Sequence, residues 1–320
     1  RWHSVTGVQT CALPIYKNLS IARPVATIGT FDGVHTGHRH VLGVLKTRAK
    51  EMKGESVVIT FEPHPGKIIS GEGFTQLLLT TTEEKISLIE ALGIDHMVIL
   101  KFSRALSRMN SESFLERILA DGIGIRHLLI GFNHSFGHMG SFSYDKISSH
   151  ASMMGITSEI LDAREEGGSV ISSTRIREAL ASGDLDLASN MLGYSYSIDG
   201  NVIRGKGLGR KLGYPTANIK PASSDKIIPA DGVYAVEAVV KGKIFPAVMS
   251  IGFNPTINTA KPERSLEVHI PGFTDDIYGE KIRVIFKYRL RGEMIFESRT
   301  ELARRIKDDI HNAMKLLRNG

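Results

Sequence analysis

The segment Gly29–His38 constrains this chain more than any other feature, because a glycine-rich turn there joins an apolar run to a helix-like segment. The apolar run Val25–Ile28 predicts a strand, and a helix is expected from about Arg39. Backbone N–H groups at a helix start have no partner within the helix, and the helix dipole is positive there, so phosphate is attracted. His35 and His38 stand at that point and could contact the same phosphate. We therefore predict a site for a nucleotide phosphate.

The turn follows neither of the common phosphate-binding patterns. The chain contains no G-x-x-x-x-G-K-[ST] sequence, and no G-x-G-x-x-G sequence opens a helix. A strand, a glycine turn and a helix often follow one another without binding a ligand, and a histidine near a helix start is often a cap or a surface residue. The prediction of a phosphate site therefore depends on the full pattern G-x-F-D-G-x-H-x-G-H.

Length and composition indicate two domains and exclude several classes of protein. At 320 residues the chain is long for a single hydrophobic core, and 42% apolar and 23% charged residues are ordinary for a globular protein. No apolar run approaches the roughly 18 residues that indicate a membrane-spanning helix. The single cysteine excludes a disulfide framework and favours a reducing compartment, so we expect a cytoplasmic protein.

The first sixteen residues differ from the rest of the chain. Arg1–Ile15 has no initiator methionine, no strand or helix periodicity and no apolar region typical of a signal peptide. The string Val5–Ile15 resembles translated sequencing-adapter sequence, so we interpret residues 1–16 as an artefact without regular structure. Fold and function are therefore expected to reside in residues 17–320.

Residues 17–193 alternate between strand and helix patterns, which predicts an α/β domain with a doubly wound parallel sheet. The expected strands are Ser56–Phe61, His96–Phe102 and His127–Phe132, and the expected helices are Glu83–Leu92 and Ser111–Leu119, with Ser111 as N-cap. Ligands of such sheets bind beyond the carboxyl ends of the strands. Gly29–His38, Phe61–Pro65 and Gly131–Gly137 fall at such ends. We expect these segments to form one site.

Residues 194–320 change to strand patterns and predict a small β-barrel covered by a C-terminal helix. The expected elements are a hairpin of Val233–Val240 and Ile244–Ser250, strands at Ser265–Ile270 and Lys281–Tyr288, and a helix at Thr300–Leu317. This half carries 21 Lys and Arg against 14 Asp and Glu, whereas residues 1–193 carry 19 against 20. Because no long basic run or aromatic-interleaved basic stripe occurs, we favour small phosphorylated ligands over nucleic acid.

Two further segments carry residues suited to phosphate. Ile171–Arg177 puts hydroxyl groups at a helix start and a basic residue one turn on, which could hold the outer phosphates of a triphosphate or simply cap a helix. Gly205–Asn218 is glycine-rich and basic, and its N–H groups could close over polyphosphate, although such loops are often surface loops. Within it, Thr216 and Asn218 offer the hard oxygen ligands that suit Mg²⁺.

Together these motifs resemble those of the prokaryotic bifunctional riboflavin kinase/FMN adenylyltransferase (FAD synthetase) family. The matching segments are G-x-F-D-G-x-H-x-G-H at 29–38, F-x-P-H-P at 61–65, I-S-S-T-x-I-R at 171–177, G-x-x-L-G-Y-P-T-A-N at 209–218 and L-E-V-H at 266–269, with others at 231–235, 250–256 and 290–296. The resemblance implies a nucleotidylyltransferase domain at 17–193 and a riboflavin kinase domain at 194–320. It also implies two reactions that use Mg²⁺ and ATP: riboflavin is phosphorylated to FMN, and FMN is adenylylated to FAD with release of pyrophosphate.

The resemblance further implies which residues form the sites. In the adenylyltransferase, ATP would be bound by Gly29, Phe31, Asp32, Gly33, His35, His38, Ser173, Thr174 and Arg177, with the two histidines catalytic, and FMN by Phe61, Pro63, His64, Pro65 and Asn133. In the kinase, ATP would be bound by Gly205, Lys206, Gly207, Gly209, Arg210, Gly213, Pro215, Thr216 and Asn218, and the metal by Thr216 and Asn218. Riboflavin would be bound by Asp231, Gly232, Val233, Tyr234 and Arg291. Glu267 would be the base that accepts the ribityl hydroxyl proton, unless it only faces solvent from an alternating strand.

The chain departs from the family pattern at two positions. Asn133 stands where many members have Asp, and the Arg usual near His138 is missing, so either change could alter FMN or nucleotide affinity.

One alternative function is an adenylyltransferase whose barrel only binds flavin, which the intact Thr216, Asn218 and Glu267 disfavour. Another is a nucleic-acid-binding protein with a basic barrel. We expect small-molecule substrates, no membrane partner, and a monomer or weak homo-oligomer.

Overall fold

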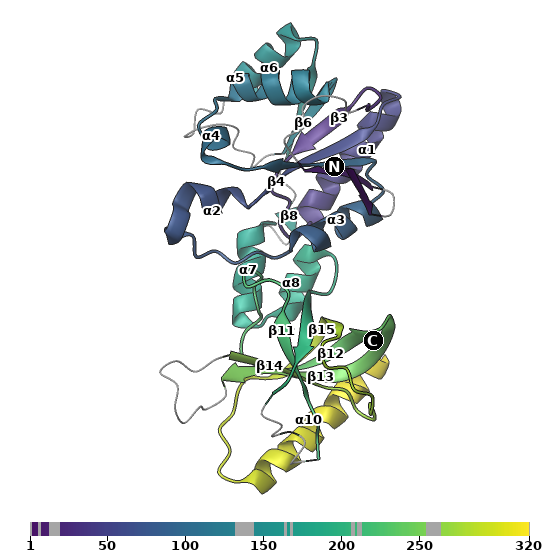
Figure 1. Ribbon diagram of the computed structural model, residues 1–320, viewed down its shortest axis with the longest axis vertical. Helices are drawn as coiled ribbons and strands as arrows, with labels where there is room; N and C mark the ends of the chain where they lie inside the picture. The colour runs from purple at the N-terminus through teal and green to yellow at the C-terminus, as the bar shows by residue number, and fades with distance from the viewer. Residues whose placement is uncertain are drawn as a thin grey trace. The chain divides into compact units, whose positions relative to one another are not determined.

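The computed structural model describes residues 2–5, 8–12, 20–131, 144–162, 165–166, 169–205, 209, 213–253 and 264–319. The chain forms two compact units, Arg1–Ser173 and Thr174–Gly320 (Figure 1). The expected boundary at residue 193 differs from this division, which groups α8 (Leu185–Leu192) and nearly all of α7 (Ser173–Ser182) with the barrel. The backbone explains the grouping, because the N–H of Ala230 donates to the carbonyl oxygen of Leu180 at 2.9 Å.

The first unit contains the expected doubly wound parallel sheet. Its parallel strands are β3 (Val25–Ile28), β4 (Ser56–Glu62), β5 (His96–Lys101), β6 (His127–Gly131) and β7 (Thr157–Leu161), in the spatial order β5-β4-β3-β6-β7. The central strands are apolar and buried, as expected when helices cover both faces of a parallel sheet. The strand order reverses between β3 and β6, and in sheets of this kind ligands bind beside that reversal.

The N-terminal segment is strand rather than structureless. β1 (Trp2–Val5) pairs antiparallel with β2 (Val8–Ala12), and β2 pairs parallel with β5 at the edge of the sheet. An edge strand presents unpaired N–H and C=O groups that accept almost any extended segment, so pairing there demands little of the sequence. The artefactual origin of residues 1–16 stays a prediction.

Helices surround the sheet of the first unit, where α1 and α3 pack against one face and α5 and η2 against the other. The helical elements are α1 (Thr36–Glu51), α2 (Pro65–Ser70), η1 (Gly71–Gly73), α3 (Thr82–Ala91), α4 (Arg104–Ser107), α5 (Ser111–Phe114), η2 (Leu115–Ile123) and α6 (Tyr144–Met153), with a short hairpin of β8 (Glu165–Glu166) and β9 (Ser169–Val170). Two expectations are corrected. Helix α1 begins at Thr36 rather than near Arg39, and Asn110 rather than Ser111 caps α5, because the Asn110 side chain accepts from the Ser113 N–H.

The second unit contains the expected barrel and C-terminal helix. The barrel closes in the order β10-β11-β14-β13-β12-β15. Its strands are β10 (Ser197–Ile203), β11 (Ala217–Pro221), β12 (Gly232–Val240), β13 (Lys243–Phe253), β14 (Arg264–His269) and β15 (Lys281–Arg291), and α10 (Arg299–Asn319) follows. The predicted hairpin is confirmed, because Val240 pairs with Lys243 across a turn in which Lys241 and Gly242 both have positive φ.

Apolar packing holds α10 on the barrel. Ala313 is fully buried, and Ile310, Met314 and Leu317 on the same face pack against a cluster from the barrel that includes Val233. The 3.6-residue spacing of these side chains is what predicts the helix from sequence. In the described part of the chain, no helix combines the length and apolarity that crossing a membrane requires.

Candidate active sites

The turn that follows β3 is held in an unusual backbone conformation. Phe31 and Val34 have φ values of 48° and 37°, in the left-handed region that non-glycine residues seldom adopt, and Gly33 has a φ of 82°. Such conformations persist only where the surrounding structure determines them, and they concentrate at functional sites. The ring of Phe31 is buried and meets the His38 ring edge-on at 5.1 Å between centroids.

Asp32 fixes this turn. Its carboxylate is only 2% exposed and accepts hydrogen bonds from the N–H groups of Leu79 and Thr80 at 3.0 Å, and from the Thr80 hydroxyl at 3.2 Å. The Gly33 N–H donates to the same hydroxyl at 3.0 Å. The carboxylate thus joins the turn to the segment that leads into α3, and a contact of Asp32 with ATP stays a prediction.

The two histidines lie together at the start of α1. The His35 side chain caps the helix, because its Nδ1 accepts from the His38 N–H at 3.3 Å, and the two rings stack at 3.6 Å between centroids. Burial lowers the pKa of His38 well below its ordinary value, and the neighbouring His35 and Lys85 lower it further. Among the described residues, the buried Nδ1 of His38 has no hydrogen-bond partner. The imidazole of His38 is therefore neutral near pH 7 and retains capacity to bind a ligand.

Only part of the second predicted phosphate motif can be placed against this turn. The Ser173 hydroxyl donates to the Asp32 carbonyl oxygen at 2.9 Å, which brings the start of α7 to the turn. Thr174 and Arg177 follow on the same helix but belong to the second unit, so their role in this site stays a prediction.

The described residues of the predicted FMN site lie at and just after the end of β4. His64 caps α2, because its Nδ1 accepts from the Gly66 N–H at 3.1 Å, and Pro65 occupies the first turn of that helix. The Phe61 ring meets Phe102 edge-on, and the His64 ring stacks with Phe74. Pro63 lies between them, and Asn133 lies outside the described residues. The cluster combines aromatic surface with a histidine, and its contact with FMN stays a prediction.

In the second unit the structure brings together the predicted base and metal ligands. The Thr216 hydroxyl donates to Glu267 Oε2 at 2.8 Å. Asn218 pairs with Glu267 across β11 and β14, so Thr216 and Asn218 share one patch of the barrel with a residue that is 51 positions from Thr216 in sequence. Gly205 lies against the Asn218 side chain, because a Cβ added there would meet the amide group of Asn218. Lys206, Gly207 and Arg210 lie outside the described residues.

A cavity of about 280 Å³ lies between the barrel and α10. Glu267 and Thr216 line one side of it, and Ile310 of α10 lines another. Phe253 and Met294 also line it and remain about half exposed. The lining is largely apolar and includes three carboxylates, of Glu267, Glu293 and Asp309, a combination suited to a flat aromatic ligand that carries hydroxyl groups.

Of the predicted riboflavin-binding residues, Val233 and Arg291 line this cavity. Tyr234 is fully buried, and its hydroxyl donates to the Ala230 carbonyl oxygen, so the structure places it in the barrel core. Asp231 forms an ion pair with Arg264 at 2.6 Å. Gly232 allows close packing, because a Cβ there would lie 2.4 Å from the Arg291 carbonyl oxygen.

The guanidinium of Arg291 is itself engaged. Its Nε and Nη2 donate to the Asp309 carboxylate at 2.8–3.2 Å, and its Nη1 donates to the Gly292 carbonyl oxygen at 3.0 Å. Asp309 is 3% exposed and lies on α10. Arg291 therefore ties α10 to the barrel beside the cavity. The sequence does not reveal this partner, because 18 residues and an element boundary separate the two.

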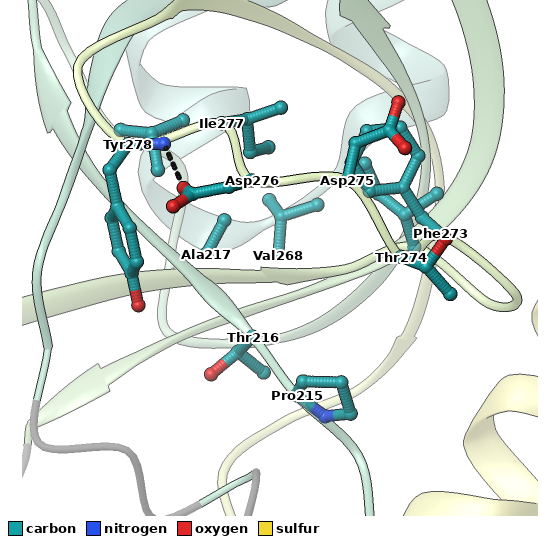
Figure 2. Close-up of a pocket in the computed structure, with 12 residues that line it drawn as sticks. Pro215, Thr216, Ala217, Val268, Phe273, Thr274, Asp275, Asp276, Ile277 and Tyr278 are labelled. Carbon is teal, nitrogen blue, oxygen red and sulfur yellow. Dashed lines mark hydrogen bonds between the residues drawn. The ribbon is translucent and has the colours of Figure 1, made fainter.

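A second cavity, of about 190 Å³, shares Thr216 with the first and is lined in part by Phe273–Tyr278, a segment outside the predicted motifs (Figure 2). Phe273–Tyr278 forms one wall, and the Tyr278 N–H donates to Asp276 Oδ1 at 3.0 Å. Pro215 and Thr216 form another wall. A further cavity lined by Arg204, Gly205 and Asn218 shares Thr216, Asp276 and Tyr278 with it. Thr216 thus stands between these spaces and the cavity that contains Glu267.

These features define a class of protein: a doubly wound α/β unit with a histidine-containing turn at a helix start, and a closed barrel with a largely apolar cavity. Comparison with known families agrees. The family model described as FAD synthetase matches residues 19–175, and the one described as riboflavin kinase matches residues 192–317.

Curated relatives match along nearly the whole chain. The bifunctional riboflavin kinase/FMN adenylyltransferase of Bacillus subtilis is 34% identical, with 93% of this chain and 94% of the relative covered. The enzyme of the same name from Pseudomonas fluorescens is 37% identical, with 91% and 92% covered. This chain therefore belongs to the bifunctional riboflavin kinase/FMN adenylyltransferase family.

A solved structure shares the overall fold. It is titled a macrolide-efflux protein from Streptococcus pneumoniae, is 27% identical, and aligns with a TM-score of 0.85 over 95% of this chain and 98% of its own. The efflux activity in that title is a statement about that protein. The family assignment of this chain comes from the family models and the curated relatives.

Proposed function

We propose that this protein makes FAD from riboflavin in two ATP-dependent steps. The second unit phosphorylates riboflavin to FMN, and the first unit adenylylates FMN to FAD with release of pyrophosphate. Matches to both halves of the family support the proposal. The observation that carries it is the carboxylate of Glu267, held by Thr216 at the wall of an apolar cavity.

In the kinase step a neutral hydroxyl must lose its proton as it attacks phosphorus. Glu267 stands where the ribityl 5′-hydroxyl would lie if the flavin ring filled the apolar part of the cavity. The hydrogen bond from Thr216 orients the carboxylate, which then accepts the proton while the new O–P bond forms and the bond to ADP breaks. This arrangement favours catalysis over simple flavin binding, because flavin binding alone does not need a carboxylate at that position.

The nucleotide of the kinase step fits the spaces on the other side of Thr216. The wall Phe273–Tyr278 supplies aromatic surface and also carries Asp275 and Asp276, and the guanidinium of Arg204 lies 5.4 Å from the centre of the Tyr278 ring. Arg204 also lines the neighbouring cavity beside Gly205, where it could contact phosphate. The terminal phosphate of ATP would then point past Thr216 toward Glu267.

The residues at this junction also fit a magnesium ion. A hydroxyl from Thr216 and an amide oxygen from Asn218 are hard ligands, and Mg²⁺ in nucleotide sites usually binds few protein groups and several phosphate oxygens. When bound, it would offset the charge of the triphosphate.

In the adenylyltransferase step both reactants are anions, so positioning and charge neutralisation dominate. The FMN phosphate attacks the α-phosphorus of ATP and displaces pyrophosphate. His38 is neutral and its Nδ1 lacks a partner among the described residues, so it can bind a phosphate oxygen beside the positive end of α1. Ser173, with Thr174 and Arg177, would hold the departing pyrophosphate.

The proposal is tested by incubating the purified protein with riboflavin, ATP and Mg²⁺ and separating riboflavin, FMN and FAD over time. FMN should appear first and FAD should follow, and chelating Mg²⁺ with EDTA should abolish FMN formation. Formation of FAD from added FMN, with no conversion of riboflavin, would show that the barrel only binds flavin. Binding of a single-stranded oligonucleotide without either reaction would indicate the nucleic-acid alternative.

We also propose that the protein acts in the cytoplasm, as a monomer or weak homo-oligomer.

A further inference from the structure

A buried lysine lies under the phosphate turn of the first unit. Lys85, in the first turns of α3, is only 6% exposed, whereas most lysines of folded proteins lie at the surface. Its Nζ donates to the Thr60 hydroxyl at 3.5 Å, and that hydroxyl donates to the Thr30 carbonyl oxygen at 3.2 Å. Lys85 is therefore linked through Thr60 to the turn that contains the two histidines.

The charges around Lys85 come from several elements. Asp32 in the turn and Glu62 at the end of β4 favour its charged form, whereas burial lowers its pKa. Asp32 is already engaged by backbone donors, and Glu62 accepts from Thr82 at 2.5 Å, so neither acid is committed to Lys85 alone. A buried ammonium with one long hydrogen bond is costly, and such a group persists where a counter-charge or a ligand compensates for it.

We propose that Lys85 is a positioning residue for adenylyl transfer: its ammonium supports the phosphate turn through Thr60 and places a positive charge beneath the bound ATP phosphates. Thr60 and the Thr30 backbone stand between Lys85 and the ligand, so Lys85 acts through the turn. This inference rests on the proposed adenylyl transfer in the first unit. It assigns a role to a residue that belongs to none of the predicted phosphate motifs.

The same charge acts on His38. Among the described residues, His35 at the N-cap of α1 and Lys85 on α3 both act on His38, and both favour its neutral form. A neutral imidazole can use the unpartnered Nδ1 without bringing a second cation into a crowded site. Loss of the Lys85 charge should therefore make His38 easier to protonate, which a purely structural role of Lys85 in packing would not predict.

The test compares Lys85→Met with Lys85→Arg in the full-length protein. The Met variant keeps the length and apolar stem of the side chain but loses the charge, whereas the Arg variant keeps the charge. We expect Lys85→Met to lower kcat/KM for FMN adenylylation by about 10- to 100-fold, mainly through KM for ATP, while Lys85→Arg retains more activity. The imidazole of His38, followed by NMR in the ligand-free protein, should titrate at higher pH in Lys85→Met than in the wild type. Riboflavin phosphorylation should stay within twofold in both variants.

Several outcomes would overturn the proposal. A folded Lys85→Met protein with unchanged adenylylation and an unchanged His38 titration excludes the role. Equal losses in both variants with no change in the titration would show that packing, not charge, is required. If Lys85→Met does not fold, Thr60→Val provides the test, because it removes the hydroxyl that links Lys85 to Thr30 and keeps the Lys85 charge. Unchanged adenylylation in Thr60→Val also excludes the role. A wild-type protein that makes no FAD would instead refute the proposed function itself.

Discussion

The two sites differ in what their carboxylates contact. In the first unit, the buried carboxylate of Asp32 accepts from the N–H groups of Leu79 and Thr80 and so holds the phosphate turn against that segment. In the second unit, Glu267 presents its carboxylate to a cavity, and Thr216 orients it. The difference matches the chemistry: joining two anionic phosphates requires donors and positive charge, whereas phosphorylating a neutral hydroxyl requires an acceptor for its proton. The predictions below test that contrast.

The largest effect is expected at Glu267. The change Glu267→Gln preserves size and hydrogen-bonding reach but removes the ability to accept a proton. Because general base catalysis is typically worth about 10²–10⁴ in rate, kcat for riboflavin phosphorylation should fall by that range with little change in riboflavin affinity. Steady-state kinetics with riboflavin, and separately with supplied FMN, measure the two steps.

A matched control lies in the same barrel. Glu237→Gln makes the same chemical change on β12, at a carboxylate that pairs with Lys287, and should leave both steps within twofold. Near-normal kinase turnover in Glu267→Gln would remove Glu267 from the mechanism. An increase in KM alone would make it a substrate-binding residue.

The next largest effect is expected at His38, in the phosphate turn of the first unit. Removing one donor to a developing charge typically costs about 10²–10³ in rate, so His38→Ala should nearly abolish FAD formation while FMN formation stays within a few-fold. The control is His40→Ala, an exposed histidine two residues along α1, which should have little effect. Equal loss of both activities in a folded His38→Ala protein would contradict the assignment of separate sites.

A smaller catalytic effect is expected from the ion pair beside the flavin cavity. Asp309→Asn should leave the Arg291 guanidinium without its counter-charge, which typically costs about 3 kcal/mol when such a pair is buried. The second unit should therefore melt at lower temperature, and KM for riboflavin should rise more than kcat falls. Asp308→Asn changes the neighbouring, exposed carboxylate of α10 and serves as control. Unchanged stability and KM in Asp309→Asn would show that the pair does not position the cavity wall.

In both units the sequence predicts the local elements better than the tertiary contacts. The pattern of apolar residues predicts β4, β5 and the hairpin of β12 and β13, because the burial of each element shows as apolar residues within that short segment. The motifs predict that Thr216, Asn218 and Glu267 act together, and the structure confirms their proximity. The sequence does not predict the role of Asp32, whose partners lie 47 and 48 residues away, nor the buried position of Lys85. Such contacts depend on tertiary packing, which leaves no periodic signal.

The fragment boundary provides another way to compare the two units. Residues 174–320 retain α8 and all of α7 except Ser173, whereas residues 194–320 lose the bond from Arg289 to the Ser182 carbonyl oxygen and the buried side chains of α8. Both fragments should phosphorylate riboflavin without making FAD, and the longer one should be more stable by thermal melting. If a folded fragment makes no FMN, the two activities are not separable along this boundary.

The smallest effect is expected at the N-terminal edge of the sheet. Deleting residues 1–16 removes β1 and β2 and leaves β5 as an edge strand, a position that many native sheets tolerate. The described apolar clusters of the first unit begin at Ile21, so the deletion should change neither activity nor Tm appreciably. Deleting residues 1–24 is the matched comparison. It also removes Ile21 and the bond from the Ala22 N–H to Glu55 at 2.6 Å, and should lower Tm by several degrees. A large loss of stability in the shorter deletion would show that β1 and β2 are a native part of the sheet.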